Sequence, residues 1–550
     1  MFRKFVPVLF AAFYCYSGVS QQKNVPEKPK LVVQVVVEQM RSDLLQRYWD
    51  RFSDKGFKKL VSEGAFCKDA SYDYMVTESA PGYATIATGA NPSEHGIVSN
   101  DWYVRLRNDI QFCVDDPKLD DSFSAFDENK YSPKQIIGST LGDELRASNY
   151  KRSKVISISI KNYASVLSGG YLANAAYWMD ENTADWVSSN YYMDSLPRWV
   201  RDFNKKDLVP VYLSREWNTL NPIGSYQQSL ADNNSYEIGF SNHQRTFPYN
   251  LKLLSLTEGS KVIKYTPYGN SYAASLAVAA IIFEELGKDN YPDLLTISFA
   301  TTGYVTDLFG VRSVELEDVY LRLDKEISHL LDVLNDRVGR ENVIVVLTSD
   351  RGVSDHPDFN AEIGAPTGEF DSQKAIFLLN SYLKAVYGKT GWVKHYSDNQ
   401  IYLDQLLIDA SKLSLADVQL KAAQFMSEFN GVAQATTGTV LQTNSFTEGN
   451  MRKFQNSYSL VRSGDILLTL KPGWVQKIKY SSKNSIPQSS PYRYDAHVPL
   501  IFYGWKIKHT EILDPVHMND IAPTLSDFLK ITFPSGTTGK LIKGLVEETN

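Results

Sequence analysis

Apolar and polar residues alternate along this chain in blocks that predict strands and helices in turn. Leu31 to Val37 is an apolar run interrupted only by Gln34, which is typical of a parallel strand covered on both faces. A helical pattern follows from Ser42 to Phe52. Further strands are predicted at Val155 to Ile160, Leu294 to Ala300, Val343 to Ser349 and Val498 to Tyr503, and further helices at Lys134 to Ala147, Tyr272 to Leu286 and Val314 to Val338. This alternation predicts the α/β class, with a doubly wound, mostly parallel sheet.

Two long stretches interrupt the alternation, from Tyr171 to Lys264 and from Ala361 to Tyr480. Both are rich in Tyr, Trp, Asn and Pro rather than in periodic apolar residues. We interpret them as inserted cap segments over the edge of the sheet, where selectivity usually resides. Residues 21–550 are therefore predicted to form one large domain with insertions at about 171–264 and 361–480.

The first 20 residues have the pattern of a secretory signal peptide. Arg3 and Lys4 precede the apolar stretch Phe5 to Tyr16, and small residues lead to a cleavage site near Ser20-Gln21. The apolar stretch is too short to span a bilayer. We expect a protein exported to the periplasm or cell envelope, or secreted, and the alternative is lipid attachment at Cys15.

The composition of the chain bears on two questions: whether it binds nucleic acid and whether its cysteines form a disulfide. With 550 residues and 43% apolar content the chain can bury a large core, and its net charge of −6 favours no nucleic-acid partner. Cys67 and Cys113 are an even count in an oxidising compartment, so a disulfide is predicted, with two separate buried thiols as the alternative.

The loops that follow the predicted strands contain the residues that could ligate a metal or take part in catalysis. Glu38 follows the first strand, and Asp350 ends the run from Val343. Ser79 precedes a helical segment, where a hydroxyl meets the positive field of a helix N-terminus. Arg351 comes directly after Asp350, and a guanidinium has no lone pair to give a metal. The site therefore has the plan of a metallohydrolase with a cation where a metal ligand is expected.

Several sequence blocks together resemble the PafA-type branch of the alkaline phosphatase superfamily, a type I phosphodiesterase/nucleotide pyrophosphatase-like group. The resemblance covers nearly all of the chain after the signal sequence. It is carried by Ala80 to Thr85, Pro92 to Tyr103, Ala173 to Trp178, Trp217 to Leu220, Thr266 to Asn270, His497 to Leu500 and Asp520 to Leu525.

The resemblance implies two zinc ions about 4 Å apart that act together on a phosphate ester. It places Ser79 at the nucleophile position, Asn100 at a phosphate-binding amide and Lys161 at a clamp lysine. The clamp arginine expected two residues after that lysine is Tyr163 here.

The same resemblance implies six metal-ligand positions, and this chain departs from most of them. In one site the residues are Glu38, Asp350 and Arg351, where Arg351 replaces a His; in the other they are Gly303, Asp307 and His497, where Gly303 replaces an Asp. Gly303 and Arg351 cannot ligate, so we expect no high-affinity zinc and no required cofactor. A single divalent cation at Glu38, Ser79 and Asp350 is one alternative, and Arg351 paired with Glu38 or Asp350 in place of the metal is another.

Three functional hypotheses follow. The first is an exported pseudo-phosphatase with a binding role or a place in a cell-envelope protein complex, whose old pocket takes a phosphate- or sulfate-like anion. The second is an active phosphate- or sulfate-ester hydrolase that uses Ser79, with Arg351 and Lys161 as the anion clamp and one metal or none. The third is an ordinary two-zinc phosphatase with His356 as a replacement ligand.

Overall fold

The computed structural model describes residues 26–119, 130–241, 243–477 and 490–546, so the predicted signal peptide lies outside the described residues. A nine-stranded sheet forms the centre of the molecule. Its strands, in spatial order, are β20 (Thr510–Ile512), β2 (Ala65–Cys67), β19 (Leu500–Gly504), β12 (Val343–Thr348), β1 (Leu31–Val37), β11 (Asp293–Phe299), β6 (Val155–Ser159), β7 (Ala175–Met179) and β8 (Trp186–Val187).

The sheet is parallel in the middle and mixed at both edges. β12, β1, β11, β6 and β7 run parallel, whereas β19 is antiparallel to β12 and β2 is antiparallel to β19. β8 is antiparallel to β7 at the other edge. The predicted α/β fold is confirmed. The direction of β19 could not be predicted, because an apolar run reads the same in either orientation.

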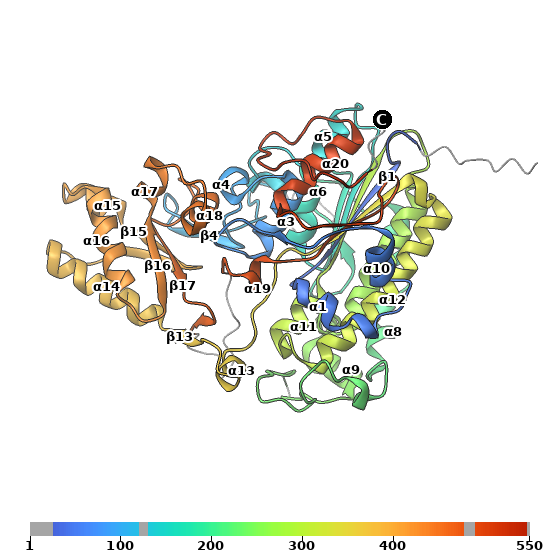
Figure 1. Ribbon diagram of the computed structural model, residues 1–550, viewed down its shortest axis with the longest axis horizontal. Coiled ribbons are helices and arrows are strands. Elements are labelled where there is room, and N and C mark those ends of the chain that lie inside the picture. Colours follow the sequence, from blue (N-terminus) through green and yellow to red (C-terminus); the bar gives the residue numbers. More distant parts are fainter. Residues whose placement is uncertain (1–25, 120–129, 242, 478–489, 547–550) are drawn as a thin grey trace, which may run out of the picture.

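Helices cover both faces of this sheet (Figure 1). Alternate residues of β1 point to opposite faces, so Val33 and Val35 pack in one core and Val32 and Val36 pack in the other. The first core also contains α10 (Pro267–Phe283), α11 (Thr301–Phe309) and α12 (Val314–Arg337), and the second contains α3 (Ser79–Thr88), α5 (Leu141–Ala147), α6 (Asn162–Gly169) and α20 (Ile521–Leu529). Each strand of the centre is therefore buried on both sides, as its largely apolar sequence predicted.

The first predicted insertion contains part of the central sheet. Ala175–Met179 and Trp186–Val187 are β7 and β8, and their aromatic residues are buried in the core. The excursion beyond the sheet begins after β8 and contains α7 (Arg198–Asn204), α8 (Leu208–Leu213), α9 (Leu251–Glu258) and the short pair β9 (Glu216–Trp217) and β10 (Tyr249–Asn250). The large aromatic residues of β7 and β8 had suggested a surface cap, but their side chains are packed in the core of the main domain.

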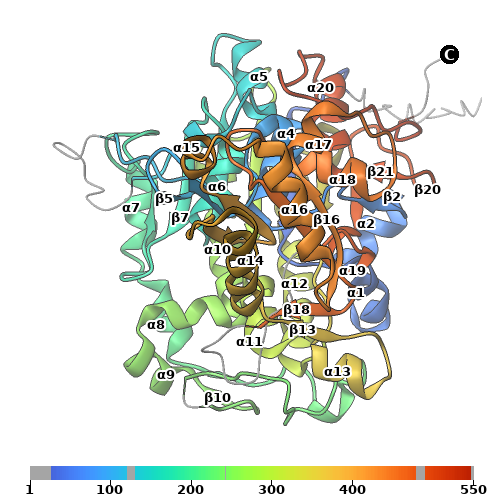
Figure 2. The ribbon, with the colours of Figure 1, turned by 90° about the vertical axis from the view of Figure 1, so that its left-hand side faces the viewer.

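The second predicted insertion forms a lobe with its own sheet and core (Figures 1 and 2). We call residues 371–477 the outer lobe. Its four strands are antiparallel, in the order β14 (Val393–Ser397), β15 (Gln400–Leu403), β17 (Ile466–Leu470) and β16 (Val432–Thr437). α14 (Ser372–Tyr387), α15 (Gln405–Ala410), α16 (Leu415–Ser427), α17 (Gly438–Thr443) and α18 (Gly449–Ser457) complete it.

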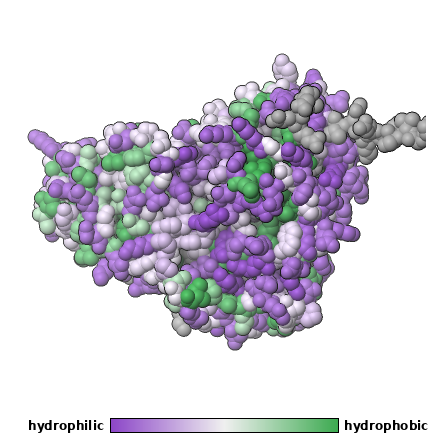
Figure 3. All heavy atoms as spheres, viewed as in Figure 1, coloured by the Kyte–Doolittle hydropathy of each residue, from purple (hydrophilic) through white to green (hydrophobic). Residues whose placement is uncertain are grey.

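Apolar side chains remain on the surface of the outer lobe. Phe377 on α14 is 70% exposed and Leu406 on α15 is 81% exposed. The space-filling view shows apolar residues scattered over this lobe among polar ones (Figure 3). Within the described part of the chain, no helix has the length and apolar character needed to cross a membrane.

The predicted disulfide between Cys67 and Cys113 is wrong. Cys67 lies in β2 and Cys113 follows β5 (Asp109–Phe112), and both are free, buried thiols. Both side chains pack in the second core, where they act as small apolar groups. Burial raises the pKa of the Cys67 thiol to about 12, so this thiol stays protonated and unreactive while the fold is intact.

Candidate functional site

The carboxyl ends of the parallel strands bring most of the sequence-predicted residues together. Glu38 follows β1, Lys161 follows β6, α11 carries Gly303 and Asp307 after β11, and Asp350 follows β12. Side-chain contacts join these loops: Lys161 reaches Glu38, and Gln39 reaches both Asp307 and Asp350. This convergence at one sheet edge is what the topology of a doubly wound sheet predicts.

A buried ion pair occupies the first predicted metal-ligand position. The Nζ of Lys161 lies 2.6 Å from Oε2 of Glu38, and the hydroxyl of Tyr83 donates to Oε1 at 3.1 Å. The Glu38 side chain is fully buried and that of Lys161 is 10% exposed. Burial, with a smaller contribution from the Asp350 carboxylate, raises the pKa of Glu38 to about 7 against the opposing field of Lys161. The ammonium also lies 4.4 Å from the ring centre of Tyr304.

Gly303 leaves the space that Glu38 fills. A Cβ at position 303 would lie 2.6 Å from Oε2 of Glu38 and 3.3 Å from its Cβ. No side chain larger than that of glycine fits while Glu38 points at Lys161. The long side chain of Glu38 can therefore take this position only because residue 303 is a glycine.

Gln39 is a site residue that the sequence did not identify. Its backbone N–H donates to Oδ1 of Asp350 at 2.8 Å, and its Nε2 donates to Oδ1 of Asp307 at 3.0 Å. The backbone of Gln39 has a φ of 55°, in the left-handed region that non-glycine residues seldom adopt. Its Oε1 and the Oδ2 of Asp350 are buried and lack a hydrogen-bond partner among the described residues. The only sequence signal was a polar residue beside Glu38 at the end of a strand.

Arg351 lies in the field of several carboxylates without pairing closely with any of them. Burial alone would lower its pKa, but Asp350, Asp307 and Asp495 hold the pKa above its usual value. Among the described residues no carboxylate lies within ion-pair distance of its guanidinium, and its buried Nε has no partner. The alternative in which Arg351 pairs with Glu38 or Asp350 is not seen as an ion pair among the described residues: Lys161 pairs with Glu38, and the Gln39 backbone binds one oxygen of Asp350.

Asp495 is a second residue that the sequence did not identify. Backbone bonds join its segment to the loop after β12, from Gly352 N to Asp495 O at 2.6 Å and from Val353 N to Tyr494 O at 2.9 Å. The side chain of Asp495 is buried; burial raises its pKa to about 7, although the hydroxyl of Ser490 and the charge of Arg351 lower it. A lone Asp in a tyrosine-rich segment gave no signal of this placement.

Ser79 begins α3, and the backbone of α3 packs directly on the loop of Asp350. A Cβ at Gly82 would lie 2.0 Å from the Asp350 carbonyl oxygen, so glycine is required for this approach. Asn100 holds the start of the helix, because its Oδ1 accepts a hydrogen bond from Ala80 N at 2.9 Å. Ser79 thus lies at the N-terminus of a helix, where the backbone field favours an anion.

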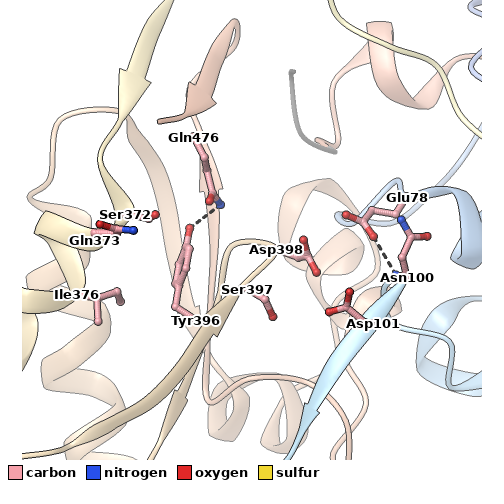
Figure 4. Close-up of a pocket in the computed structure, with 10 residues that line it drawn as sticks. All are labelled: Glu78, Asn100, Asp101, Ser372, Gln373, Ile376, Tyr396, Ser397, Asp398 and Gln476. Carbon is pink, nitrogen blue, oxygen red and sulfur yellow. Dashed lines mark hydrogen bonds between the residues drawn. The ribbon is translucent and has the colours of Figure 1, made fainter. Parts of the chain in front are cut away.

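A cavity of about 540 Å³ opens beside this helix, between the main domain and the outer lobe. Figure 4 shows Glu78, Asn100 and Asp101 on one side and Asp398 reaching toward them from the outer lobe. The Ser99 hydroxyl lies 2.8 Å from Glu78 Oε2 and 2.6 Å from Asp398 Oδ2. The remaining wall residues are Ser372, Gln373, Ile376, Tyr396, Ser397 and Gln476.

Two histidines expected near the site lie elsewhere. The Nε2 of His497 lies 3.0 Å from the Lys68 carbonyl oxygen and 3.9 Å from Asp69, in the loop after β2. His356 caps α13 (Pro357–Glu362) and stacks on Tyr236. Among the described residues, no three His, Cys, Asp or Glu side chains are grouped closely enough to hold a metal.

The sheet, the loops at its carboxyl edge and the serine-initiated helix define a protein of the alkaline phosphatase superfamily. Residues 32–494 match the family model for type I phosphodiesterase/nucleotide pyrophosphatase. The chain therefore belongs to this family, in its PafA-type alkaline phosphatase branch.

Individual relatives agree along the whole chain. Alkaline phosphatase PafA of Elizabethkingia meningoseptica is 35% identical over 96% of both chains, and its crystal structure superimposes with a TM-score of 0.88 over 94% of this chain and 99% of that chain. Alkaline phosphatase PhoV of Synechococcus elongatus is 33% identical over 99% of this chain and all of the relative. A Myroides odoratus protein named calcium-transporting ATPase is 36% identical over the full length of both.

Proposed function

We propose that this protein is an exported pseudo-phosphatase, which keeps the phosphatase fold and uses the degraded two-zinc site for binding rather than for ester hydrolysis. One observation carries the proposal: the Lys161 ammonium is paired at 2.6 Å with Glu38, a carboxylate that the family chemistry needs for a metal. An internal cation thus neutralises the acid that would otherwise attract zinc.

The remaining ligand positions do not fit two zinc ions. Gly303 offers no donor atom, Arg351 is a cation close to Asp350 and Asp307, and His497 is turned toward Lys68. Structural and catalytic zinc sites use three or four firm ligands each. This donor set supports no required zinc cofactor, and a single hard cation at Asp350 is the limit of what it favours.

Two groups at the carboxyl edge of the sheet, apart from the walls of the acidic cavity, have features of an anion-binding site. The Nε of Arg351 is buried without a partner among the described residues, and Ser79 lies at the N-terminus of α3. A guanidinium and a helix N-terminus together favour a phosphate- or sulfate-like group. We propose such an anion as the ligand, either free or as part of a protein partner in a cell-envelope complex.

An active hydrolase is the second candidate, because Ser79 stands at the position that the family resemblance gives to the nucleophile, at the start of α3. In that case Ser79 would attack a phosphate or sulfate ester, with Arg351 and Lys161 supplying positive charge. The pairing of Lys161 with Glu38 leaves one cation fewer for stabilising the charge of such a reaction.

The test uses the mature protein, purified without added metal. We expect fewer than two zinc ions per chain by elemental analysis, no turnover of aryl phosphate or aryl sulfate with or without zinc, and binding of inorganic phosphate or sulfate by calorimetry. Arg351→Gln is expected to weaken anion binding at least about tenfold, since a charge-assisted contact contributes about 1.5–3 kcal/mol. Arg198→Gln, a change at an arginine whose side chain is 90% exposed, is the matched control.

Two results would contradict the proposal in different ways. Two tightly held zinc ions with phosphatase activity would show that the site is intact in function. Metal-independent or single-metal turnover that Ser79→Ala abolishes would instead establish the hydrolase.

A further inference from the structure

A second cavity, of about 560 Å³, lies at the carboxyl edge of the sheet, where β6 and β7 end. Its wall comes from separate parts of the chain, among them the end of β5, the loop after β6, the turn between β7 and β8, and α11. Lys161 belongs to this wall, but the residues of the cavity beside Ser79 do not. Doubly wound sheets bind their ligands at this edge, so the cavity has the position of a ligand site.

Aromatic rings form a continuous part of the wall. Phe112 lies edge-to-face to Tyr131 and to Tyr163, with ring centres 6.4 Å and 6.1 Å apart. Tyr131 makes the same kind of contact with Trp178 at 5.7 Å. Phe112, Tyr131 and Tyr163 are only partly buried although each packs on another ring. Because these rings line the cavity, part of their apolar surface remains for a ligand to cover.

Tyr163 extends the aromatic wall to Lys161. The Lys161 ammonium lies 5.7 Å from the ring centre of Tyr163 and 4.4 Å from that of Tyr304, which also lines the cavity. The family resemblance implies an arginine at position 163. The tyrosine found there supplies a ring in place of a second cation, so this part of the site has changed from charged to aromatic.

The ionic groups around the cavity are already paired within the protein. Lys161 pairs with Glu38 at 2.6 Å, and Glu181 pairs with Lys264 at 2.6 Å. The Oδ1 of Asp180 accepts two backbone N–H groups of its own turn, at 2.9 Å and 2.8 Å. A charged ligand of either sign would have to compete with these partners. The cavity therefore favours an uncharged ligand.

Neutral hydrogen-bonding groups stand beside the rings. Asn162 follows β6 and Asn182 lies in the turn after β7, and both line the cavity. A side-chain amide donates and accepts hydrogen bonds, as the hydroxyl groups of a polyol do. A purely apolar ligand would make no use of these amides. A ring that carries hydroxyl groups matches both parts of the wall.

We propose that this cavity binds a neutral sugar ring. The C–H face of a sugar packs on aromatic rings, and its hydroxyl groups hydrogen-bond to amides and carboxylates. The cavity volume lies within the range of ordinary sites for small ligands. The proposal goes beyond the anion site and does not depend on it, because the sugar contacts the aromatic wall rather than Arg351.

The test titrates the whole mature protein with neutral sugars by saturation-transfer NMR. The probes are methyl glucoside, methyl galactoside, methyl mannoside and N-acetylglucosamine, and we expect at least one to bind at about 10 mM or below. Tyr131→Ala should weaken that binding at least about fivefold, because it removes a central ring of the wall. Asn182→Ala, at an exposed position of the turn, should weaken it about two- to tenfold by removing a hydrogen bond.

Tyr382→Ala is the matched control, because Tyr382 is a half-buried tyrosine that stacks on Phe425 in the outer lobe at 4.5 Å. It should leave sugar binding unchanged, and so should Arg351→Gln, which separates this cavity from the anion site. Failure of all the sugars to bind would overturn the proposal, as would unchanged binding in both Tyr131→Ala and Asn182→Ala. Equally tight binding of benzene would also overturn it, because an apolar ring would then suffice.

Discussion

At the scale of single residues, the contact between Gly303 and Glu38 gives the most direct prediction. Gly303→Asp places a Cβ 2.6 Å from Oε2 of Glu38 and adds a carboxylate to a buried site. We expect a loss of about 2–4 kcal/mol in the free energy of unfolding, from overpacking and like charge. Denaturant unfolding of the purified protein measures it.

Two further variants identify the cause. In Glu38→Asp/Gly303→Asp the shorter acid withdraws from position 303, so part of the loss should be recovered. Gly224→Asp is the matched control, since a Cβ at Gly224 meets nothing within 4 Å. Equal losses for Gly303→Asp and Gly224→Asp would show that the close contact is not the cause.

The chemistry of individual side chains was predictable where it depends on residue type alone. Gly303 cannot ligate and Arg351 cannot accept a metal, whatever their surroundings. Pairing depends on three-dimensional placement instead. Lys161 rather than Arg351 contacts Glu38, and His497 contacts Lys68. The orientation of these side chains depends on how the loops pack in the folded protein, which the spacing of residues along the sequence does not determine.

At the scale of elements, an acidic contact joins the outer lobe to the main domain. Asp398, between β14 and β15, approaches Glu78 and Asp101 across the cavity and shares the hydroxyl of Ser99 with Glu78. Burial raises the pKa of Asp398, and the nearby Glu78 carboxyl raises it further. A group whose pKa is raised on folding stabilises the contact below its ordinary pKa and loses that contribution as pH rises through the raised value.

The lobe contact should therefore weaken as pH increases. Amide hydrogen exchange of residues 393–403, corrected for the intrinsic rate, is expected to be faster relative to the main sheet at pH 9 than at pH 6. Asp398→Asn, which cannot ionise, should remove this dependence. Asp409→Asn, at an exposed acid of the same lobe, should retain it, and an unchanged wild-type profile would contradict the idea.

Elements with uniform burial were the most predictable. β1 begins and ends at the predicted residues and β12 ends one residue early. Strands covered on both faces have largely apolar sequences, which mark their bounds clearly. α12 was predicted to within one residue from its helical pattern. α10 begins five residues before the prediction, at Pro267, where proline fits the first turn of a helix. β7 was missed because its Tyr and Trp resembled those of the cap.

At the scale of the whole molecule, the fold does not depend on a covalent link. Cys67 and Cys113 are free thiols inside the second core. We expect Tm to be the same with and without reductant, and thiol titration to detect both groups only after denaturation without reductant. One bridged pair in the unreduced, denatured protein, with a fall in Tm on reduction, would restore the disulfide prediction.

The fit between Gly303 and Glu38 also constrains how such a site could change over time. An acid cannot return at position 303 while Glu38 fills its space, and shortening Glu38 first leaves the Lys161 ammonium without its close partner. Each single step toward a zinc site therefore passes through a less stable protein. Selection on stability alone would therefore keep Gly303 and Glu38 together.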